Sequence, residues 1–280
     1  MNLPFTLDLK DKVAVVTGGG GVLCSMFAEV LAECGAKVAI LDLRADAAQA
    51  VADKIAQEGG QAKGYETDVL DKASLEHTHR KIIDDFGKCD ILINGAGGNN
   101  PKGTTDKEYF EIGDLEKDIK TFFDLDPGGV QFVFDLNFIG TLLPTQVFAK
   151  DMLGSGNIIN ISSMNAFCPL TKIPAYSGAK AAVSNFTKWL AVHFAKSGIR
   201  VNAIAPGFFV TNQNKAMLYH EDGTPTARTD KIIAATPMGR FGEAEELIGT
   251  LMWLLNDKAS GFVDGTVIPV DGGFSAYSGV

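Results

Sequence analysis

The stretch VAVVTGGGGVLCSMFAEVLAECGAKVAILD (13–42) decides the fold of this 280-residue chain. Its first five residues are apolar or β-branched, which predicts a buried strand over 13–17. Four consecutive glycines follow, and then an apolar-rich helix runs to Glu33 and is closed by Gly35. A second strand over 37–41 leads to Asp42. Strand, glycine turn, helix and strand in this order predict a β-α-β unit with parallel strands.

The same alternation continues along the chain. Helices over 45–57 and 71–86 flank a strand over 62–66, and a strand over 91–93 runs into Asn94-Gly95-Ala96-Gly97. A further strand is expected over 157–161. No internal repeat, low-complexity tract or linker divides the sequence. We therefore predict an α/β fold with a doubly wound parallel sheet of the Rossmann type, as a single domain over residues 1–280.

Composition excludes several classes of function. A formal net charge of −9 argues against a surface for nucleic acid or an anionic membrane. No apolar run is long enough to span a membrane, and residues 1–12 lack the apolar core of a signal peptide. The histidines form no metal-binding pattern, and the four cysteines are scattered without ligand spacing. We expect a reduced, cytoplasmic protein without a metal centre.

The glycine run, Gly18 to Gly21, lies where a helix N-terminus can approach a pyrophosphate. Asp42 follows Gly18 by twenty-four residues and can accept both hydroxyls of an adenosine ribose. Its carboxylate would repel a 2′-phosphate, which favours NAD over NADP, although Arg44 weakens that preference. Asp68, at the end of the third strand, would face the adenine by the same reasoning. The alternative interpretation of the glycines is a flexible turn that binds nothing.

Tyr176 and Lys180 lie four residues apart in a helical pattern that begins near Pro174 and ends near Gly198. They therefore share one helix face, and Ser163, just after the strand over 157–161, could meet them at one carbonyl group. A tyrosine acts as an acid or base near neutrality if its pKa falls from ~10 towards ~7, which needs about 4 kcal/mol. One cation about 4 Å away supplies that energy at an effective dielectric of about 20. The alternative is a helix with an exposed lysine and no catalytic role.

Taken together, these motifs resemble those of the short-chain dehydrogenase/reductase family. The matching residues appear in the family's order: Thr17-Gly18, Asn94-Gly95-Ala96-Gly97, Asn137, Ser163, Tyr176, Lys180, Pro206-Gly207 and Asp271-Gly272-Gly273. The resemblance spans residues 9–274. It implies NAD(P)-dependent hydride transfer at a CH–OH group, a small-molecule substrate and a homo-oligomer, in many members a tetramer.

The resemblance also implies roles for individual residues. Tyr176 would be the acid/base, Lys180 would lower its pKa and hold the nicotinamide ribose, and Ser163 would polarise the substrate oxygen. Asn137 would hold the water of a proton relay. Residues 204–207 would border the nicotinamide, and Thr211 would bond the cofactor near its amide or pyrophosphate. The expected cofactor contacts are Gly18, Gly19, Gly20, Gly21, Val22, Leu23, Asp42, Asp68, Val69, Asn94, Ala96, Tyr176, Lys180, Pro206, Gly207 and Thr211.

The glycine loop departs from the family pattern. The family has two further glycines where this chain has Val22 and Cys24, so the loop can take a shifted path. Cys24 has two interpretations. A helix N-terminus lowers a thiol pKa, which would make Cys24 redox-sensitive. Alternatively, Cys24 is a small packing residue.

A second departure is an insertion over about 98–129, roughly twenty residues longer than the family's usual connection and of a length that is often functional. It follows the carboxyl end of the fourth strand, where ligands bind in such sheets. With a substrate loop over about 208–240, it would offer a polar, partly cationic lining suited to a hydroxylated carboxylate. The candidate substrate residues are Asn99, Asn100, Lys102 and Asn165. The asparagines could equally be turn formers.

Two stretches resemble the short-chain type of D-mannonate oxidoreductase: Gly97-Gly98-Asn99-Asn100-Pro101-Lys102 and Ser162-Ser163-Met164-Asn165-Ala166-Phe167. This resemblance implies hydride transfer between NAD(H) and a sugar acid, D-mannonate or D-fructuronate. Another polyol or sugar acid, such as gluconate with 5-ketogluconate, or a ketoacyl substrate remains an alternative. A cofactor-binding regulator without turnover is disfavoured because Ser163, Tyr176 and Lys180 are all present.

Overall fold

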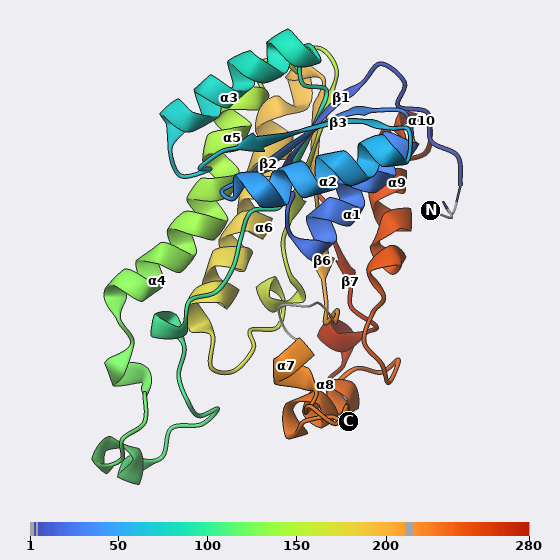
Figure 1. The fold of residues 1–280 in the computed structure, drawn as a ribbon. Helices are drawn as coiled ribbons and strands as arrows, with labels where there is room; N and C mark the ends of the chain where they lie inside the picture. The colour runs from blue at the N-terminus through green and yellow to red at the C-terminus, as the bar shows by residue number, and fades with distance from the viewer. Residues whose placement is uncertain (1–2, 4, 211–214, 280) are drawn as a thin grey trace.

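The computed structural model describes residue 3, residues 5–210 and residues 215–279, and these residues form one parallel sheet between two layers of helices (Figure 1). The seven strands lie in the order β3-β2-β1-β4-β5-β6-β7. The described strands are β1 (Val13–Thr17), β2 (Lys37–Asp42), β3 (Gln61–Glu66), β4 (Ile91–Asn94), β5 (Gly156–Ile161), β6 (Ile199–Pro206) and β7 (Val267–Val270). Every residue of β1, β4 and β5 is buried, as expected for strands covered on both faces. The predicted doubly wound sheet is confirmed.

Helices cover both faces of the sheet. Apolar residues of α1 (Val22–Glu33), α2 (Ala45–Gln57) and α9 (Ile248–Leu255) share one core with the sheet. Residues of α3 (Lys72–Asp85), α5 (Gly140–Phe148) and α6 (Pro174–Phe194) form the core on the opposite face. The remaining described helices are α4 (Pro127–Phe134), α7 (Lys215–Leu218), α8 (Ala227–Ala235) and α10 (Asp257–Ser260). In the described part of the chain, none of the helices is long and apolar enough to cross a membrane.

The strand order reverses at β1. Thr17, the last residue of β1, pairs with Leu41 of β2 on one side and with Asn94 of β4 on the other. The chain therefore leaves β1 in one direction for β2 and β3, and continues in the other direction from β4 onward. In open parallel sheets a ligand crevice lies outside the carboxyl ends of the strands at this reversal. The fold thus puts the glycine loop and the residues after β4 at the expected ligand site.

The insertion is an extended arm rather than a second sheet or helix bundle. It contains three 3₁₀ turns, Pro101–Gly103, Ile112–Glu116 and Phe122–Asp124, before α4 begins. The buried carboxylate of Asp114 holds the arm together, because Lys107 and Lys117 each bind it at 2.8 Å. Figure 1 shows the arm projecting from the lower left of the molecule, below α4.

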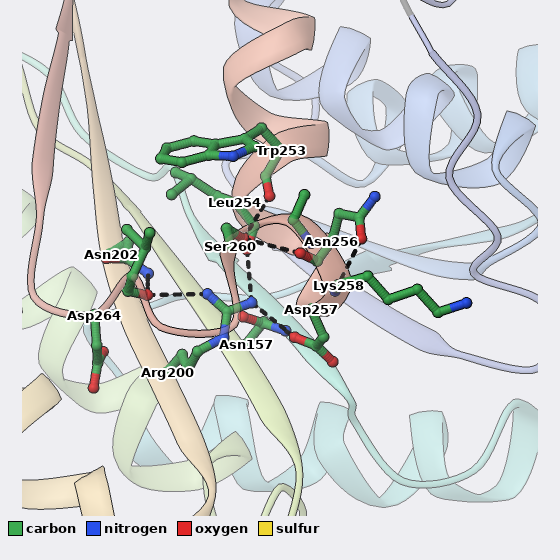
Figure 2. Close-up of polar contacts among 12 residues, drawn as sticks. Asn157, Arg200, Asn202, Trp253, Leu254, Asn256, Asp257, Lys258, Ser260 and Asp264 are labelled. Atoms are coloured by element: carbon green, nitrogen blue, oxygen red, sulfur yellow. Dashed lines mark hydrogen bonds and ion pairs between the residues drawn. The ribbon is translucent and has the colours of Figure 1, made fainter.

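Arg200, near the start of β6, stabilises the end of the sheet that lies away from the ligand crevice (Figure 2). Its guanidinium donates to Val263 O at 3.1 Å, Leu254 O at 2.8 Å and Asp257 Oδ1 at 2.8 Å. Asn157 Nδ2, near the start of β5, donates to the same Asp257 oxygen at 3.3 Å. This Arg200 cluster joins β5, β6 and the α9–α10 turn at the end of the sheet away from the crevice.

Candidate active site

Three side chains expected to carry catalysis meet beside the carboxyl end of β5. Ser163 follows β5 by two residues, and Tyr176 and Lys180 occupy the first two turns of α6. A hydrogen bond joins the hydroxyl of Ser163 to the phenol of Tyr176. Lys180 Nζ lies 5.7 Å from the centroid of the Tyr176 ring. Ser163, Tyr176 and Lys180 therefore come together in the fold, as their spacing in the sequence predicts.

Lys180 is deeply buried, with 4% of its surface exposed, and its Nζ donates to Ile161 O at 2.8 Å. Burial lowers the pKa of Lys180 to about 8, while the neighbouring Cys24 acts in the opposite direction. Gly97 allows this arrangement, because a Cβ atom there would lie 2.6 Å from Asn137 Oδ1 and 3.1 Å from Lys180 Nζ. The ammonium, Gly97 and Asn137 thus form one closely packed corner of the site.

The pKa of Tyr176 depends mainly on burial. Burial raises its pKa above the ordinary value, and the hydrogen bond with Ser163 acts in the opposite direction. Lys180 Nζ donates to the carbonyl of Ile161 and lies over the tyrosine ring. Desolvation of the phenolate is thus the dominant effect on the Tyr176 pKa in this arrangement, and the lowering of that pKa by Lys180 stays a prediction.

Asn137 lies in a π-helical turn, Asp135–Ile139, between α4 and α5. Its Nδ2 donates to Gly98 O at 2.8 Å and Val133 O at 2.7 Å, and its Oδ1 accepts from Gly98 N at 3.3 Å. Single π turns inside helices are frequent at functional sites. Both amide hydrogens of Asn137 are engaged, one with Gly98 after β4 and one with Val133 of α4, so a relay water would have to donate to one of its oxygens.

Hydrogen bonds within the protein shape the glycine loop. The N–H groups of Gly19, Gly20 and Gly21 bond to Leu41 O at 3.0 Å, Asp42 Oδ2 at 3.1 Å and Gly18 O at 3.0 Å. Gly18 adopts a left-handed φ of 64°, and a Cβ atom there would lie 2.9 Å from the backbone of Ala96. Three of the four glycine N–H groups expected to face a pyrophosphate are therefore already engaged.

The first turn of α1 is better placed to bind an anion. Gly21 is the residue before the helix, and none of the described side chains caps it. The first N–H groups of a helix have no partner inside the helix and favour a negative charge. Of the predicted pyrophosphate contacts, Val22 and Leu23 therefore lie in the most favourable position.

Asp42 lies at the end of β2 beside this loop, and its side chain is 14% exposed. One carboxylate oxygen accepts from Gly20 N at 3.1 Å, and the other accepts from Arg44 N at 3.0 Å. Each oxygen of an ionised carboxylate can accept a second hydrogen bond. Asp42 is therefore able to receive the two hydroxyls of a ribose while it remains fixed to the loop.

Cys24 fills the space under the loop. Its Sγ packs against Gly95, where any side chain would collide with the sulfur. Burial raises the pKa of Cys24 to about 12; Lys180 acts in the opposite direction, and Asp42 adds to the increase. The thiol is therefore protonated at neutral pH. This supports the packing interpretation of Cys24 and argues against a reactive thiolate.

The side chain of Asn94 does not face the crevice. Its Nδ2 donates to Thr145 Oγ1 at 3.0 Å and to Asn160 Oδ1 at 2.9 Å, and Asn160 Nδ2 donates to Thr187 Oγ1 at 2.9 Å. These four buried residues link β4 and β5 to α5 and α6. The predicted cofactor contact of Asn94 could come from its backbone only.

The other predicted cofactor residues lie at the same edge of the sheet. Asp68 is exposed just after β3, where its Oδ1 accepts from Leu70 N at 2.8 Å, and Val69 is buried against Gly140. Pro206 ends β6, and Gly207 follows it. Thr211 lies outside the described residues.

The predicted substrate residues divide into two groups. Asn100 Oδ1 accepts from Lys102 N at 2.9 Å, and Asn99 Nδ2 donates to Thr104 Oγ1 at 3.0 Å, so both asparagines shape the arm as turn formers. Lys102 is exposed. Asn165 differs from them: it is 4% exposed, its backbone N–H donates to Ser163 Oγ at 3.3 Å, and its Oδ1 has no partner among the described residues.

A pocket of about 400 Å³ lies between the arm, the segment 170–172 and α8. It brings together charged residues that the sequence patterns did not single out, namely Glu108, Lys172, Arg228 and Lys231. Phe208 and Phe274 provide apolar wall, with their ring centroids 5.3 Å apart. The charged residues come from three separate segments, so only the fold reveals that they are neighbours. For Glu108 the available signal was its position in the predicted insertion, and for Arg228 and Lys231 it was the predicted substrate loop; no sequence signal pointed to Lys172.

Comparison with known proteins agrees with this geometry. The sequence model of the short chain dehydrogenase family matches residues 12–222. An uncharacterised oxidoreductase of Haemophilus influenzae is 61% identical over 282 residues, which cover 100% of this chain and 99% of the relative. The 7alpha-hydroxysteroid dehydrogenase of Escherichia coli (strain K12) is 31% identical over 269 residues, which cover 95% of each protein.

A solved structure is similar over nearly the whole chain. It is a crystal structure from Haemophilus influenzae, provisionally named a D-mannonate oxidoreductase and containing bound NAD. It aligns with a TM-score of 0.95 at 62% sequence identity and covers 98% of both chains. The family match, the full-length relatives and the assembled Ser163, Tyr176 and Lys180 lead to one conclusion: this chain belongs to the short-chain dehydrogenase/reductase family.

Proposed function

We propose that the protein is an NAD-dependent oxidoreductase that interconverts a sugar acid and its keto form, with D-mannonate and D-fructuronate as the pair. The observation that carries this proposal is Asn165, whose backbone N–H bonds to Ser163 Oγ and whose buried side-chain Oδ1 has no partner among the described residues. A buried polar atom without a partner is unfavourable, and a substrate hydroxyl would satisfy it. The NAD-containing relative provisionally named for D-mannonate supports the choice of substrate.

The residues of the crevice fit a dinucleotide. The first turn of α1 would hold the pyrophosphate, and Asp42 would accept the adenosine ribose hydroxyls. The carboxylate of Asp42 disfavours a 2′-phosphate, so NAD is proposed rather than NADP. When bound, the nicotinamide supplies or accepts the hydride.

The polar side chains would position and protonate the substrate. Ser163 and Tyr176 would donate hydrogen bonds to the carbonyl oxygen, and Tyr176 would then transfer its proton to that oxygen. Burial raises the pKa of Tyr176, which keeps the phenol protonated at neutral pH, as reduction of the ketone requires. Lys180 would stabilise the phenolate left behind, and a water held by an Asn137 oxygen would return the proton.

A second candidate is a reductase for a ketoacyl or other apolar ketone. The apolar wall formed by Phe208 and Phe274 favours it, because such a surface would contact a hydrocarbon chain. Charged and polar residues at the same pocket argue for the sugar acid. The two functions differ in the ketone that is turned over.

The deciding experiment measures oxidation of NADH and of NADPH in the presence of D-fructuronate, with D-tagaturonate, 5-ketogluconate, fructose and an acetoacetyl thioester in parallel. Rapid NADH oxidation with D-fructuronate alone is the expected result. Activity with the thioester alone would replace the proposed substrate by the second candidate. Faster turnover with NADPH than with NADH would contradict the role given to Asp42.

We also propose that the protein is a homo-oligomer. Helix α6 exposes Trp189 and Val192 at 55% and 81% of their surface. Trp189 also stacks on His193, at 4.6 Å between ring centroids. Exposed large apolar side chains close together on a long helix often mark a subunit contact. Light scattering of the purified protein should give a multiple of the monomer mass, and Val192→Glu should lower it; a monomeric wild type would refute the proposal.

A further inference from the structure

We propose that Lys172, Arg228 and Lys231 form a recognition site for a carboxylate group of the substrate. The site lies in the pocket between the arm, the segment 170–172 and α8. The inference rests on the proposed function, because it assigns the residues that would distinguish a keto acid from a neutral ketone.

The pocket carries an excess of positive charge. Of the described residues that line it, three are cationic and only Glu108 is acidic. Lys231 Nζ binds Glu108 Oε1 at 2.8 Å, whereas Lys172 and Arg228 form no ion pair with any described residue. The pocket therefore keeps an excess of positive charge in a chain whose net charge is −9. A planar carboxylate is the ligand that arginine and lysine bind most readily in this setting.

One wall of the pocket lies on the segment between two catalytic residues. Residues 170–172 belong to the segment that joins Ser163 to Tyr176, and Lys172 precedes α6 by two residues. Phe208, on another wall, follows the Pro206-Gly207 end of β6. One wall of the pocket therefore belongs to the segment that carries the catalytic residues, while the arm and α8 supply the others. An open-chain keto acid with its ketone at Tyr176 could extend its carboxylate end into this neighbouring space.

The backbone of Lys172 has an unusual conformation. Its φ of 71° is left-handed, a conformation that among the described residues other than glycine recurs only at Asp11. Such strain persists where surrounding contacts enforce it, and it is concentrated at functional sites. The arm contacts the backbone at this point, since Thr105 N donates to Lys172 O at 2.9 Å. The insertion is thus joined to the backbone that carries one cation of the site.

The carboxylate of Glu108, also on the arm, would compete with a substrate carboxylate for these cations. Its carboxylate is bound to Lys231 and lies within the field of Lys172 and Arg228. A substrate carboxylate would take over part of this interaction. Removal of Glu108 should therefore strengthen binding of an acid, while removal of a cation should weaken it.

The test compares a charged substrate with a neutral one of nearly the same shape. The values of kcat and KM are measured for D-fructuronate and for its primary amide, with wild-type protein, Lys172→Gln, Arg228→Gln and Glu108→Gln. Lys196→Gln is the matched control, because Lys196 is an exposed cation in a 3₁₀ turn after α6 and does not line the pocket. A change mainly in KM indicates a loss of substrate recognition, whereas a general loss of structure would lower kcat as well.

Each cation variant should lower kcat/KM for the acid by about 10-fold, mainly through KM, as expected for loss of a hydrogen bond to a charged group. The values for the amide should stay unchanged. Glu108→Gln should shift KM for the acid in the opposite direction, and added salt should weaken binding of the acid but not of the amide. Lys196→Gln should behave as wild type.

Failure of this inference is distinguishable from failure of the proposed function. Good turnover of D-fructuronate with an unchanged acid-to-amide ratio in Lys172→Gln and Arg228→Gln would refute the carboxylate site and leave the function intact. If only 5-ketogluconate is turned over and the variants lose that activity selectively, the substrate is wrong and the site stands. Equal wild-type activity on acid and amide would overturn the site directly.

Discussion

Replacement of Lys180 by methionine should change how stability depends on pH. The pKa of Lys180 is lowered from its ordinary 10.5 to about 8 because the ammonium is buried. The folded protein therefore holds this proton less tightly than the unfolded chain does. The resulting destabilisation is fully present below pH 8 and disappears as the pH rises through 10.5. Between pH 7 and pH 10 the relief of this cost amounts to about 2 to 3 kcal/mol.

Lys180→Met keeps the length and volume of the side chain but cannot titrate. The assay is urea unfolding of wild type and variant at pH 7 and at pH 10, without cofactor. The free energy of unfolding of the variant minus that of wild type should fall by about 2 to 3 kcal/mol between the two conditions. The carbonyl of Ile161 loses its donor at both pH values, so this loss cancels in the comparison. Cys24, beside the ammonium, titrates above this window, with a pKa of about 12.

Lys188→Met provides the control, because Lys188 lies on the same helix and is exposed. Its difference from wild type should be the same at both pH values. A Lys180→Met difference that does not change with pH would refute the reasoning, since it would mean that the ammonium keeps its hydration in the folded protein.

Three further outcomes are expected. Tyr176→Phe should lower kcat by roughly 10²–10⁴-fold while NADH binding, followed by fluorescence, stays close to wild type; a variant with nearly normal kcat would remove Tyr176 as the acid. Arg200→Met removes one of two donors at each of Val263 O and Leu254 O, which keep Asn202 Nδ2 and Ser260 Oγ, and it also removes the cation bound to Asp257. Urea unfolding should therefore show a loss of about 1 to 3 kcal/mol, whereas kcat per folded molecule should not change. The thiol of Cys24 should resist iodoacetamide at pH 8 in the native state and react after unfolding, as read by peptide mass spectrometry; rapid native labelling would contradict its burial and raised pKa.

Much of the fold was predictable because apolar runs between glycines report burial directly. The strands over 13–17, 37–41 and 91–93 appear as β1, β2 and β4 with their ends shifted by at most one residue. The meeting of Ser163, Tyr176 and Lys180 also followed from spacing, since four residues on a helix and the end of a strand have known directions.

Other properties depend on the three-dimensional surroundings and were not predictable. The pKa of Tyr176 is set by burial, which no four-residue spacing reveals. Asn94 was expected at the cofactor, yet its amide bonds to Thr145 and Asn160 inside the protein. Lys172 and Arg228 are fifty-six positions apart in the sequence, and they line one pocket only after the sheet and α8 have formed.

The location of the Arg200 cluster has a consequence for how this protein could change over evolution. The cluster binds β5, β6 and the α9–α10 turn at one end of the sheet, while the arm and α8 lie at the other (Figures 1 and 2). Loops at the crevice end can therefore lengthen or be replaced without disturbing the contacts that anchor the strands. New substrate ranges would arise by exchange of these loops, with the hydride-transfer residues inherited unchanged.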